Sequence, residues 1–168
     1  QNLACAGYGN MMLFTADAKG QAKVPMPSYY TARLLTREWT LPGHGAHRIL
    51  NAQIADMPGE EVEAFPVRRP DGKIAVLLVN RSPTKSFTLP LMAQDAKGGR
   101  PLIGPGELAT YGPAQYSWID AGEESHPGRS EPPLRTALPA GPVSVTLPAD
   151  SIAVVVVDGG TLSLARGN

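Results

Sequence analysis

The sequence predicts a mainly β protein, an antiparallel β-sandwich preceded by one β-α unit. Short apolar or alternating segments recur between turn signals, which is typical of an antiparallel sandwich. The 168 residues include 17 prolines and 18 glycines, which supply many fixed turns, while the hydrophobic fraction of 42% is that of a globular protein. Apolar residues at helical spacing occur in one stretch near the amino terminus.

The first stretch, residues 9–17, is almost continuously apolar, which favours a strand buried on both faces, as in a parallel sheet covered by helices. A polar turn follows at residues 17–21. Residues 28–39 then have the spacing of an amphipathic helix, which Pro42 and Gly43 end. One strand and one helix cannot bury their own apolar faces. The unit therefore needs neighbours from elsewhere, or it packs on the domain that follows.

From His47 onward the period changes to that of strands. Residues 62–68 alternate, residues 70–73 form a tight turn, and residues 74–79 are continuously apolar, so a β-hairpin is expected here. Further strands are expected at 86–89, around Tyr116 and Trp118, at 143–147 and at 151–157. Residues 93–107 and 120–139 are rich in Gly, Pro or polar residues, and we expect loops there.

Charge and cysteine usage exclude several classes of function. Fifteen basic residues balance fifteen acidic ones, so no nucleic-acid or membrane partner is expected. No apolar run approaches the roughly 20 residues that cross a bilayer.

The single cysteine, Cys5, excludes an internal disulfide framework, and with no histidine nearby it is not a candidate nucleophile. The chain opens at Gln1 without Met or a signal-peptide pattern, and we expect it to be cut from a longer protein.

The helix segment has a specific resemblance. Residues 28–39, Ser-Tyr-Tyr-Thr-Ala-Arg-Leu-Leu-Thr-Arg-Glu-Trp, with residues 42–45 behind them, resemble the last barrel helix of clan-A glycoside hydrolases similar to family 39, which includes β-xylosidases and α-L-iduronidases. Residues 69–81, 111–118 and 147–152 resemble strands of the sandwich that follows the barrel in such enzymes. These short matches indicate architecture better than substrate.

The resemblance implies a division of the chain. Residues 1–45 would complete a (β/α)8 barrel, with residues 11–16 as the eighth strand and 28–39 as the eighth helix; residues 46–160 would be the C-terminal β-sandwich and 161–168 a tail. The expected partners are an upstream catalytic barrel, in the same protein or as a separate chain, and a carbohydrate substrate. An extracellular or periplasmic location is expected.

The resemblance also places the chemistry outside this chain. Retaining glycosidases use two carboxylates about 5 Å apart. In family members these glutamates end the fourth and seventh barrel strands, which would lie upstream of Gln1. We therefore expect no catalytic residue here. The acidic pairs at 60–61 and 123–124 have no apolar surroundings to separate their pKa values and are expected to be solvated surface.

No cofactor and no metal are expected either. His44 and His47 form an H-x-x-H pair, but their segment contains two glycines and offers no third ligand at regular spacing. A loop over the domain junction is the favoured interpretation. His126 stands alone beside a proline and is expected to be exposed.

Four residues are candidates for contact with a saccharide. Thr15 and Asp17 would end a barrel strand, where side chains face the active site, although Asp17 also suits a turn before Ala18. Tyr116 and Trp118, near Tyr111, offer flat faces that stack on sugar rings, although such residues more often fill a core or a domain seam.

Two other functions compete with the hydrolase segment. One is a stand-alone carbohydrate-binding β-sandwich without catalysis, and the other is a structural or adhesion sandwich that binds protein. The β-α unit favours the hydrolase, because a free binding module has no use for an isolated apolar strand and amphipathic helix.

Overall fold

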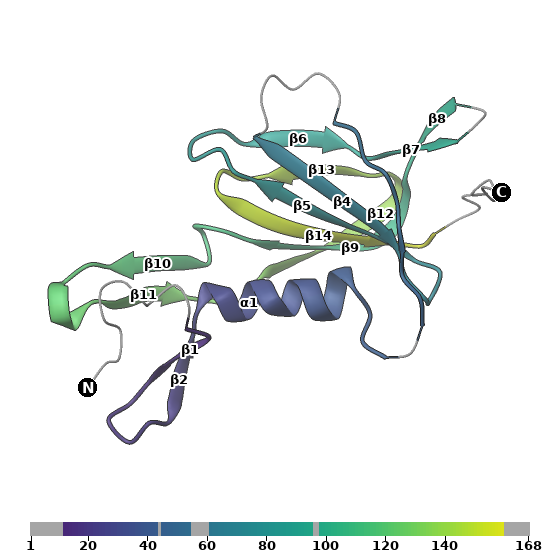
Figure 1. Cartoon of the computed structure of the whole chain (residues 1–168). Coiled ribbons are helices and arrows are strands. Elements are labelled where there is room, and N and C mark those ends of the chain that lie inside the picture. Colours follow the sequence, from purple (N-terminus) through teal and green to yellow (C-terminus); the bar gives the residue numbers. More distant parts are fainter. Residues whose placement is uncertain (1–11, 44, 55–60, 96–97, 160–168) are drawn as a thin grey trace.

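The computed structural model describes residues 12–43, 45–54, 61–95 and 98–159. It is mainly β, and all its strand pairs are antiparallel, which confirms the predicted class (Figure 1). No helix in the described residues is long and apolar enough to cross a membrane.

The centre of the fold is a six-stranded sheet with the order β12-β9-β14-β5-β4-β3. Its strands are β3 (Arg48–Ile49), β4 (Val62–Arg68), β5 (Ile74–Asn80), β9 (Ile103–Tyr111), β12 (Leu134–Pro142) and β14 (Ser151–Val157). The expected hairpin is β4–β5, and Gly72, at φ +83°, makes its turn. Because β14 lies between β5 and β9, its ladder hydrogen bonds are satisfied on both edges.

Both faces of this sheet are covered, which explains the continuous apolar runs in β5 and β14. On one face, Val76, Leu78 and Val155 pack in a cluster with Val145 and Leu147 of β13. The strand β13 (Ser144–Leu147) pairs with β6 (Phe87–Pro90) in a two-stranded sheet of its own. A second small hairpin, β7 (Met92–Asp95) with β8 (Gly98–Pro101), follows β6 along the chain.

The other face carries the helix. Helix α1 (Pro27–Arg33) begins with a proline at its first position and continues as a π-helical segment, Leu34–Trp39. Tyr30 and Leu34 are buried in a cluster whose sheet members are Leu77, Ala109, Tyr111 and Val154. The expected helix at 28–39 is therefore present, and it packs on the sheet that follows it in the sequence.

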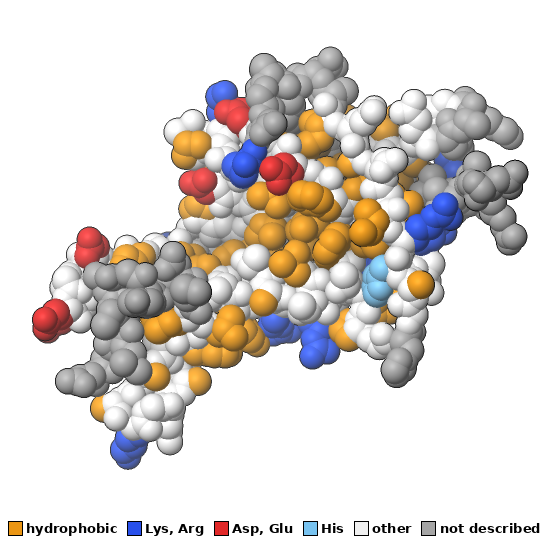
Figure 2. Space-filling view, viewed as in Figure 1, with side chains coloured by type: hydrophobic (Ala, Val, Ile, Leu, Met, Phe, Trp, Pro, Cys, Tyr) orange, Lys and Arg blue, Asp and Glu red, His pale blue; other side chains and the backbone are white. Residues whose placement is uncertain are grey.

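Two hairpins extend beyond the sheet (Figure 1). They are β1 (Phe14–Ala16) with β2 (Ala22–Pro25), and β10 (Tyr116–Ile119) with β11 (His126–Ser130); a short 3-10 turn, Gly122–Glu124, lies between the last two. The Ser130 hydroxyl donates to the Pro25 carbonyl and ties the two hairpins together. Figure 2 shows hydrophobic side chains gathered over the central strands of the viewed face, with charged side chains around its edge.

The expectation of a strand buried on both faces at residues 9–17 is wrong for the residues that the structure describes; residues 9–11 lie outside them. That residues 11–16 form the eighth strand of a barrel stays a prediction. Phe14–Ala16 pairs antiparallel with β2, and Leu13 and Phe14 are 49% and 36% exposed. Asp17 is the physical reason, because its Oδ1 accepts hydrogen bonds from the amides of Lys19 and Gln21 and so reverses the chain.

The two expected loops are also wrong, since both contain strands. Residues 93–107 contribute to β7, β8 and β9, and residues 120–139 contribute to β11 and β12. The strand β12 lies at the sheet edge and is mostly exposed, so it has the polar and proline content of an edge strand. Pro105 of β9 lies opposite the register shift between Leu138 and Gly141, where no ladder partner is required.

Candidate functional site

Two hollows border the helix on the face of the sheet that it covers. Each is lined both by residues of the helix and by residues of β9 and β14. The first, of about 540 Å³, we call the tyrosine hollow; its lining includes Thr31, Asn80, Tyr111, Tyr116, Asp150 and Ile152. The second, of about 390 Å³, we call the charged hollow; its lining includes Arg37, Glu38, Arg69, Lys73, Glu107 and Arg135.

The register of the sheet assembles the tyrosine hollow. Ile152 of β14 pairs with Val79 on one side and with Tyr111 on the other, so the three form one row across the sheet. The turn after β9 brings Pro113 and Tyr116 to the same end, and α1 supplies Pro27 and Thr31. The floor of the hollow is consequently apolar, with polar groups around it.

Tyr111 is the most unusual residue of this hollow. It is 5% exposed, its ring centroid lies 5.4 Å from that of Tyr30, and its hydroxyl has no hydrogen-bond partner among the described residues. Burial, with the nearby Tyr30 and Tyr116, raises its pKa to about 12. The phenol therefore remains protonated at neutral pH, and its oxygen is shielded from solvent.

Tyr116 lies beside it in a different setting. It begins β10 opposite Ser130 and is half-buried, and burial raises the pKa of its phenol. The turn that carries it is fixed, because the Gln115 side chain accepts from the amide of Gly112 while the Tyr116 amide donates to the Gly112 carbonyl. This hydrogen-bonded turn therefore holds Tyr116 in a fixed position.

Two polar residues at the strand ends use their side chains for hydrogen bonds to backbone carbonyls. The Asn80 amide donates to the carbonyls of Lys85 and Pro148 at 2.8 and 2.7 Å, and the Ser151 hydroxyl donates to Pro148 at 2.6 Å. Asp150 differs. Its backbone takes a left-handed φ of 46°, its amide donates to Ser82, and its carboxylate has no bonding partner in the part of the chain that the structure describes.

The four sequence-predicted contact residues lie in three places. Tyr116 lines the tyrosine hollow, whereas Trp118 lies farther along β10 and is 39% exposed. Thr15 and Asp17 belong to the β1–β2 hairpin, where the Thr15 hydroxyl accepts from Val24. The pKa of Asp17 is lowered by the hydrogen bond from Gln21 and the ion pair with Lys23, which suits its turn-forming role.

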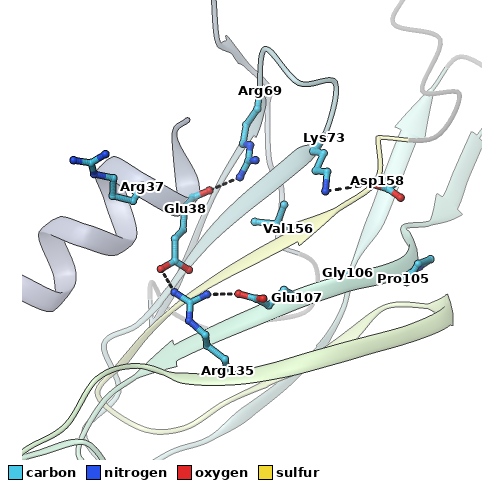
Figure 3. A pocket seen from close by; sticks show the side chains of 10 residues that line it. All are labelled: Arg37, Glu38, Arg69, Lys73, Pro105, Gly106, Glu107, Arg135, Val156 and Asp158. Atoms are coloured by element: carbon cyan, nitrogen blue, oxygen red, sulfur yellow. Dashed lines mark hydrogen bonds and ion pairs between the residues drawn. The ribbon is translucent and has the colours of Figure 1, made fainter. Parts of the chain in front are cut away.

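The charged hollow fastens the helix to the sheet (Figure 3). Arg135 of β12 pairs with both Glu38 and Glu107, and Arg69 donates to the Glu38 carbonyl at 2.8 Å. Lys73 lies 3.7 Å from Asp158. Desolvation lowers the pKa of Arg135, but the hydrogen bonds and charges of the two glutamates outweigh it and raise the pKa above its usual value. These charges are paired with one another, whereas Arg37, which also lines the hollow, has no ion pair or side-chain hydrogen bond among the described residues.

The remaining candidates are also engaged or isolated. The amide of Leu41 donates to Nε2 of His47 at 2.9 Å, and His126 bonds the carbonyl of Glu124. Glu61 pairs with Lys85. Cys5, His44 and Glu60 lie outside the described residues. Within those residues no group of three or more His, Cys, Asp or Glu side chains could hold a metal.

Comparison with known proteins finds no match to a protein-family model and none to a curated protein. Similar solved structures include several glycoside hydrolases, at low identity and over part of each chain, and a DUF1255 protein of unknown function from Acinetobacter sp. ADP1 (14% identity, TM-score 0.32, 66% of this chain and 92% of that one). One of the hydrolases is a GH30 endoxylanase from Clostridium papyrosolvens C71 (16% identity, TM-score 0.37, 67% of this chain and 23% of that one). A second is a GH51 arabinofuranosidase from Xanthomonas axonopodis pv. citri (22% identity, TM-score 0.38, 63% of this chain and 20% of that one). A third is a family 44 xyloglucanase from Paenibacillus polymyxa (13% identity, TM-score 0.39, 66% of this chain and 18% of that one). The chain thus spans about a fifth of the length of these three hydrolases, none of which is from family 39.

Proposed function

We propose that this chain is the C-terminal segment of a glycoside hydrolase that acts on O-glycosidic bonds. Its β-module stabilises the catalytic barrel and edges the substrate cleft. The proposal starts from the residues that resemble family 39 enzymes, namely 28–39 at the helix and 69–81, 111–118 and 147–152 in the strands. The working location of such an enzyme would be extracellular or periplasmic.

The observation that carries the proposal is the packing of the helix. Leu34 is fully buried and Tyr30 is 7% exposed, both against the six-stranded sheet. Burial of two such side chains contributes on the order of 3–6 kcal/mol. A barrel whose last helix is Pro27–Trp39 would therefore be held to the module by its own chain.

Three acidic residues near the charged hollow support a stabilising role over a chemical one. Glycoside hydrolysis needs one carboxyl group as acid and a second as base or nucleophile, both free to reach the bond. Glu38 and Glu107 instead share Arg135, and Asp71 is held by Arg69. The reacting pair would come from the upstream barrel.

The test compares this chain with the longest product of its gene on a panel of p-nitrophenyl glycosides. We expect turnover by the longer product and none by residues 1–168 alone. Turnover by the purified 168-residue chain would show that it holds a catalytic pair. A longer product without a barrel, or a gene product that begins at Gln1, would contradict the proposal and leave the stand-alone binding module.

A further inference from the structure

The sequence contains two Asp-Gly dipeptides, at residues 71–72 and at residues 158–159. An aspartyl residue can cyclise when the next residue is glycine, because glycine has no side chain to hinder the approach of its amide nitrogen to the aspartyl carboxyl carbon. Water then opens the ring, and one of the two products is an isoaspartyl residue. Since the two dipeptides are chemically alike, their surroundings in the fold decide which of them reacts.

Asp71 and Gly72 lie in the turn between β4 and β5, where both reacting groups are engaged. The two oxygens of the Asp71 carboxylate accept from the Arg69 guanidinium at 3.3 and 2.5 Å, and one of them also accepts from the Lys73 amide at 3.2 Å. The Gly72 amide donates to the Arg69 carbonyl at 3.0 Å. This turn therefore holds the carboxyl carbon and the attacking nitrogen apart.

The hydrogen bond from Arg69 protects Asp71 in a second way, because it lowers the pKa of the carboxyl. Cyclisation proceeds through the protonated acid, which loses its hydroxyl as water. The protonated population at neutral pH falls about tenfold for each unit by which a pKa falls. Geometry and protonation thus act in the same direction at this turn.

Asp158 and Gly159 follow β14 and have fewer contacts. The Asp158 side chain is 69% exposed, and it lies 3.7 Å from Lys73, which is an ion pair but too long for a hydrogen bond (Figure 3). The Gly159 amide donates to no other residue of the described chain. Because exposed ion pairs contribute little, the carboxyl group is free to turn toward this amide.

The two dipeptides are also neighbours in space. Beyond the last pair of the β5–β14 ladder, Asp158 faces Lys73, and Gly159 approaches Gly72 so closely that a Cβ on Gly159 would overlap the Gly72 carbonyl oxygen. An isoaspartyl link adds one methylene group to the main chain here and shortens the carboxylate side chain. It would therefore break both of these contacts at the end of the sheet.

We propose that Asp158-Gly159 is a site of spontaneous isoaspartate formation in the folded protein, and that the turn at residues 69–73 protects Asp71-Gly72. The Gly159 nitrogen attacks the side-chain carboxyl carbon of Asp158; the nitrogen loses its proton and the carboxyl its hydroxyl, so one water leaves and a succinimide forms. Water then adds to the ring. Attack at the side-chain carbonyl restores Asp158, and attack at the main-chain carbonyl gives isoaspartate, without change in the oxidation state of any atom.

The experiment ages residues 1–168 at neutral pH and body temperature, folded in buffer and, in parallel, unfolded in guanidinium chloride. Electron-transfer mass spectrometry of proteolytic peptides locates isoaspartate, and methylation by a protein isoaspartate methyltransferase measures its total. In the folded chain, we expect isoaspartate to accumulate several-fold faster at residue 158 than at residue 71. In the unfolded chain the two rates should become similar, because the contacts of Asp71 are lost.

Substitutions test each half of the proposal. Asp158→Glu keeps the carboxylate but would have to close a larger and less favourable ring, so most of the methylation of the folded chain should disappear. Arg69→Gln removes the guanidinium from Asp71 and should raise isoaspartate at residue 71 several-fold, with residue 158 unchanged. Circular dichroism before ageing checks that each variant is folded.

A matched pair of asparagine variants leaves Arg69 in place and does not depend on the folding of Arg69→Gln. Asparagine forms the same succinimide with loss of ammonia, so the change in mass reports the reaction directly. We expect folded Asp158→Asn to deamidate several-fold faster than folded Asp71→Asn, because the Gly72 amide remains bonded to the Arg69 carbonyl.

Two results would overturn the proposal. One is an equal rate of isoaspartate formation at residues 71 and 158 in the folded chain. The other is no isoaspartate at residue 158 of the folded chain over a time in which the unfolded chain forms it. Neither result bears on glycoside turnover by the longer gene product, so this site and the proposed function stand or fall separately.

Discussion

Asn80 joins three separate segments through one buried side chain. It is 2% exposed; its amide donates to carbonyls at Lys85, Leu147 and Pro148, and its Oδ1 accepts from the amide of Ser82 at 3.0 Å. The turns after β5 and after β13 are thereby held together at the end of the sheet. No apolar residue of the same size could satisfy these backbone groups.

We therefore expect Asn80→Ala to lower the free energy of unfolding by about 2–4 kcal/mol, since it leaves the Ser82 amide and the Lys85 carbonyl without their Asn80 partner. Urea denaturation followed by circular dichroism measures the change. Asn51→Ala, at an exposed position, is the matched control and should change stability by less than about 0.5 kcal/mol. Equal effects of the two substitutions would show that the network contributes little.

Asp71 makes stability depend on acid pH. The hydrogen bond from Arg69, with which it forms an ion pair at 2.5 Å, holds the pKa of its carboxyl below the usual value. A folded-state pKa below that of the unfolded chain gives stability that is present above about pH 4 and is lost as pH falls through the folded value.

The difference in unfolding free energy between the natural chain and Asp71→Asn should accordingly shrink as pH falls from about 6 to about 2. Denaturation curves across that range measure it, and a carbon-detected NMR titration of the Asp71 carboxyl gives the pKa directly. A difference that stays constant with pH would contradict the assigned ion pair.

At the scale of elements, apolar packing and ion pairs both hold the helix to the sheet, but they contribute different amounts of free energy. Leu34 is fully buried against the sheet, whereas in the ion pair that reaches the helix the side chains of Arg135 and Glu38 are 48% and 15% exposed. Truncation of a buried leucine costs about 2–5 kcal/mol, while an exposed ion pair contributes about 0–1 kcal/mol. Apolar packing fixes the helix, and the ion pairs set its orientation.

Leu34→Ala should therefore destabilise the protein several times more than Arg135→Ala, by about 3 against about 1 kcal/mol. A double-mutant cycle of Arg135→Ala with Glu38→Gln measures their coupling, which we expect to be below about 1 kcal/mol. A larger coupling would mean that the charged hollow, and not the apolar cluster, dominates the attachment.

The same elements show which parts of the fold the sequence predicts. The strands β5 and β14 were predictable because burial on both faces requires continuous apolar residues, and the turn at residues 70–73 because Gly72 adopts a positive φ. The strand β12 was not predictable, since an exposed edge strand shows no apolar periodicity in its sequence. The hairpin at Phe14–Ala16 was missed because local capping by Asp17 outweighed the apolar run.

The candidate site was less predictable than the fold. Tyr111 and Tyr116 are visible in the sequence as an aromatic cluster, but Thr31 and Asp150 are not connected to them there. Only the register of Ile152 with Tyr111 brings the turn before β14 beside the turn after β9. Strand register of this kind depends on pairings between distant segments, which one sequence does not specify.

At the scale of the whole molecule, the protection of backbone amides against hydrogen exchange should decrease from the centre of the large sheet outward. The interior strands β5 and β14 are buried on both faces, whereas the two hairpins expose Leu13, Ile119 and other apolar side chains. Elements with few buried contacts open at low free-energy cost.

Amide hydrogen exchange followed by mass spectrometry should thus show β5 and β14 exchanging last and the β1–β2 hairpin first. The β10–β11 hairpin should lie between them, because Arg129 bonds the Ala114 carbonyl and Ser130 bonds Pro25. Exchange of β14 as fast as that of the hairpins would contradict this order.

The place of β14 also bears on how the polypeptide is made. It is the last strand of the described chain, yet it lies between β5 and β9, which are synthesised earlier. A nascent chain on the ribosome would hold two unpaired strand edges until residue 157 emerges, and such edges attract other chains. Chaperone binding during synthesis would consequently be most useful between the emergence of Tyr111 and that of Val157.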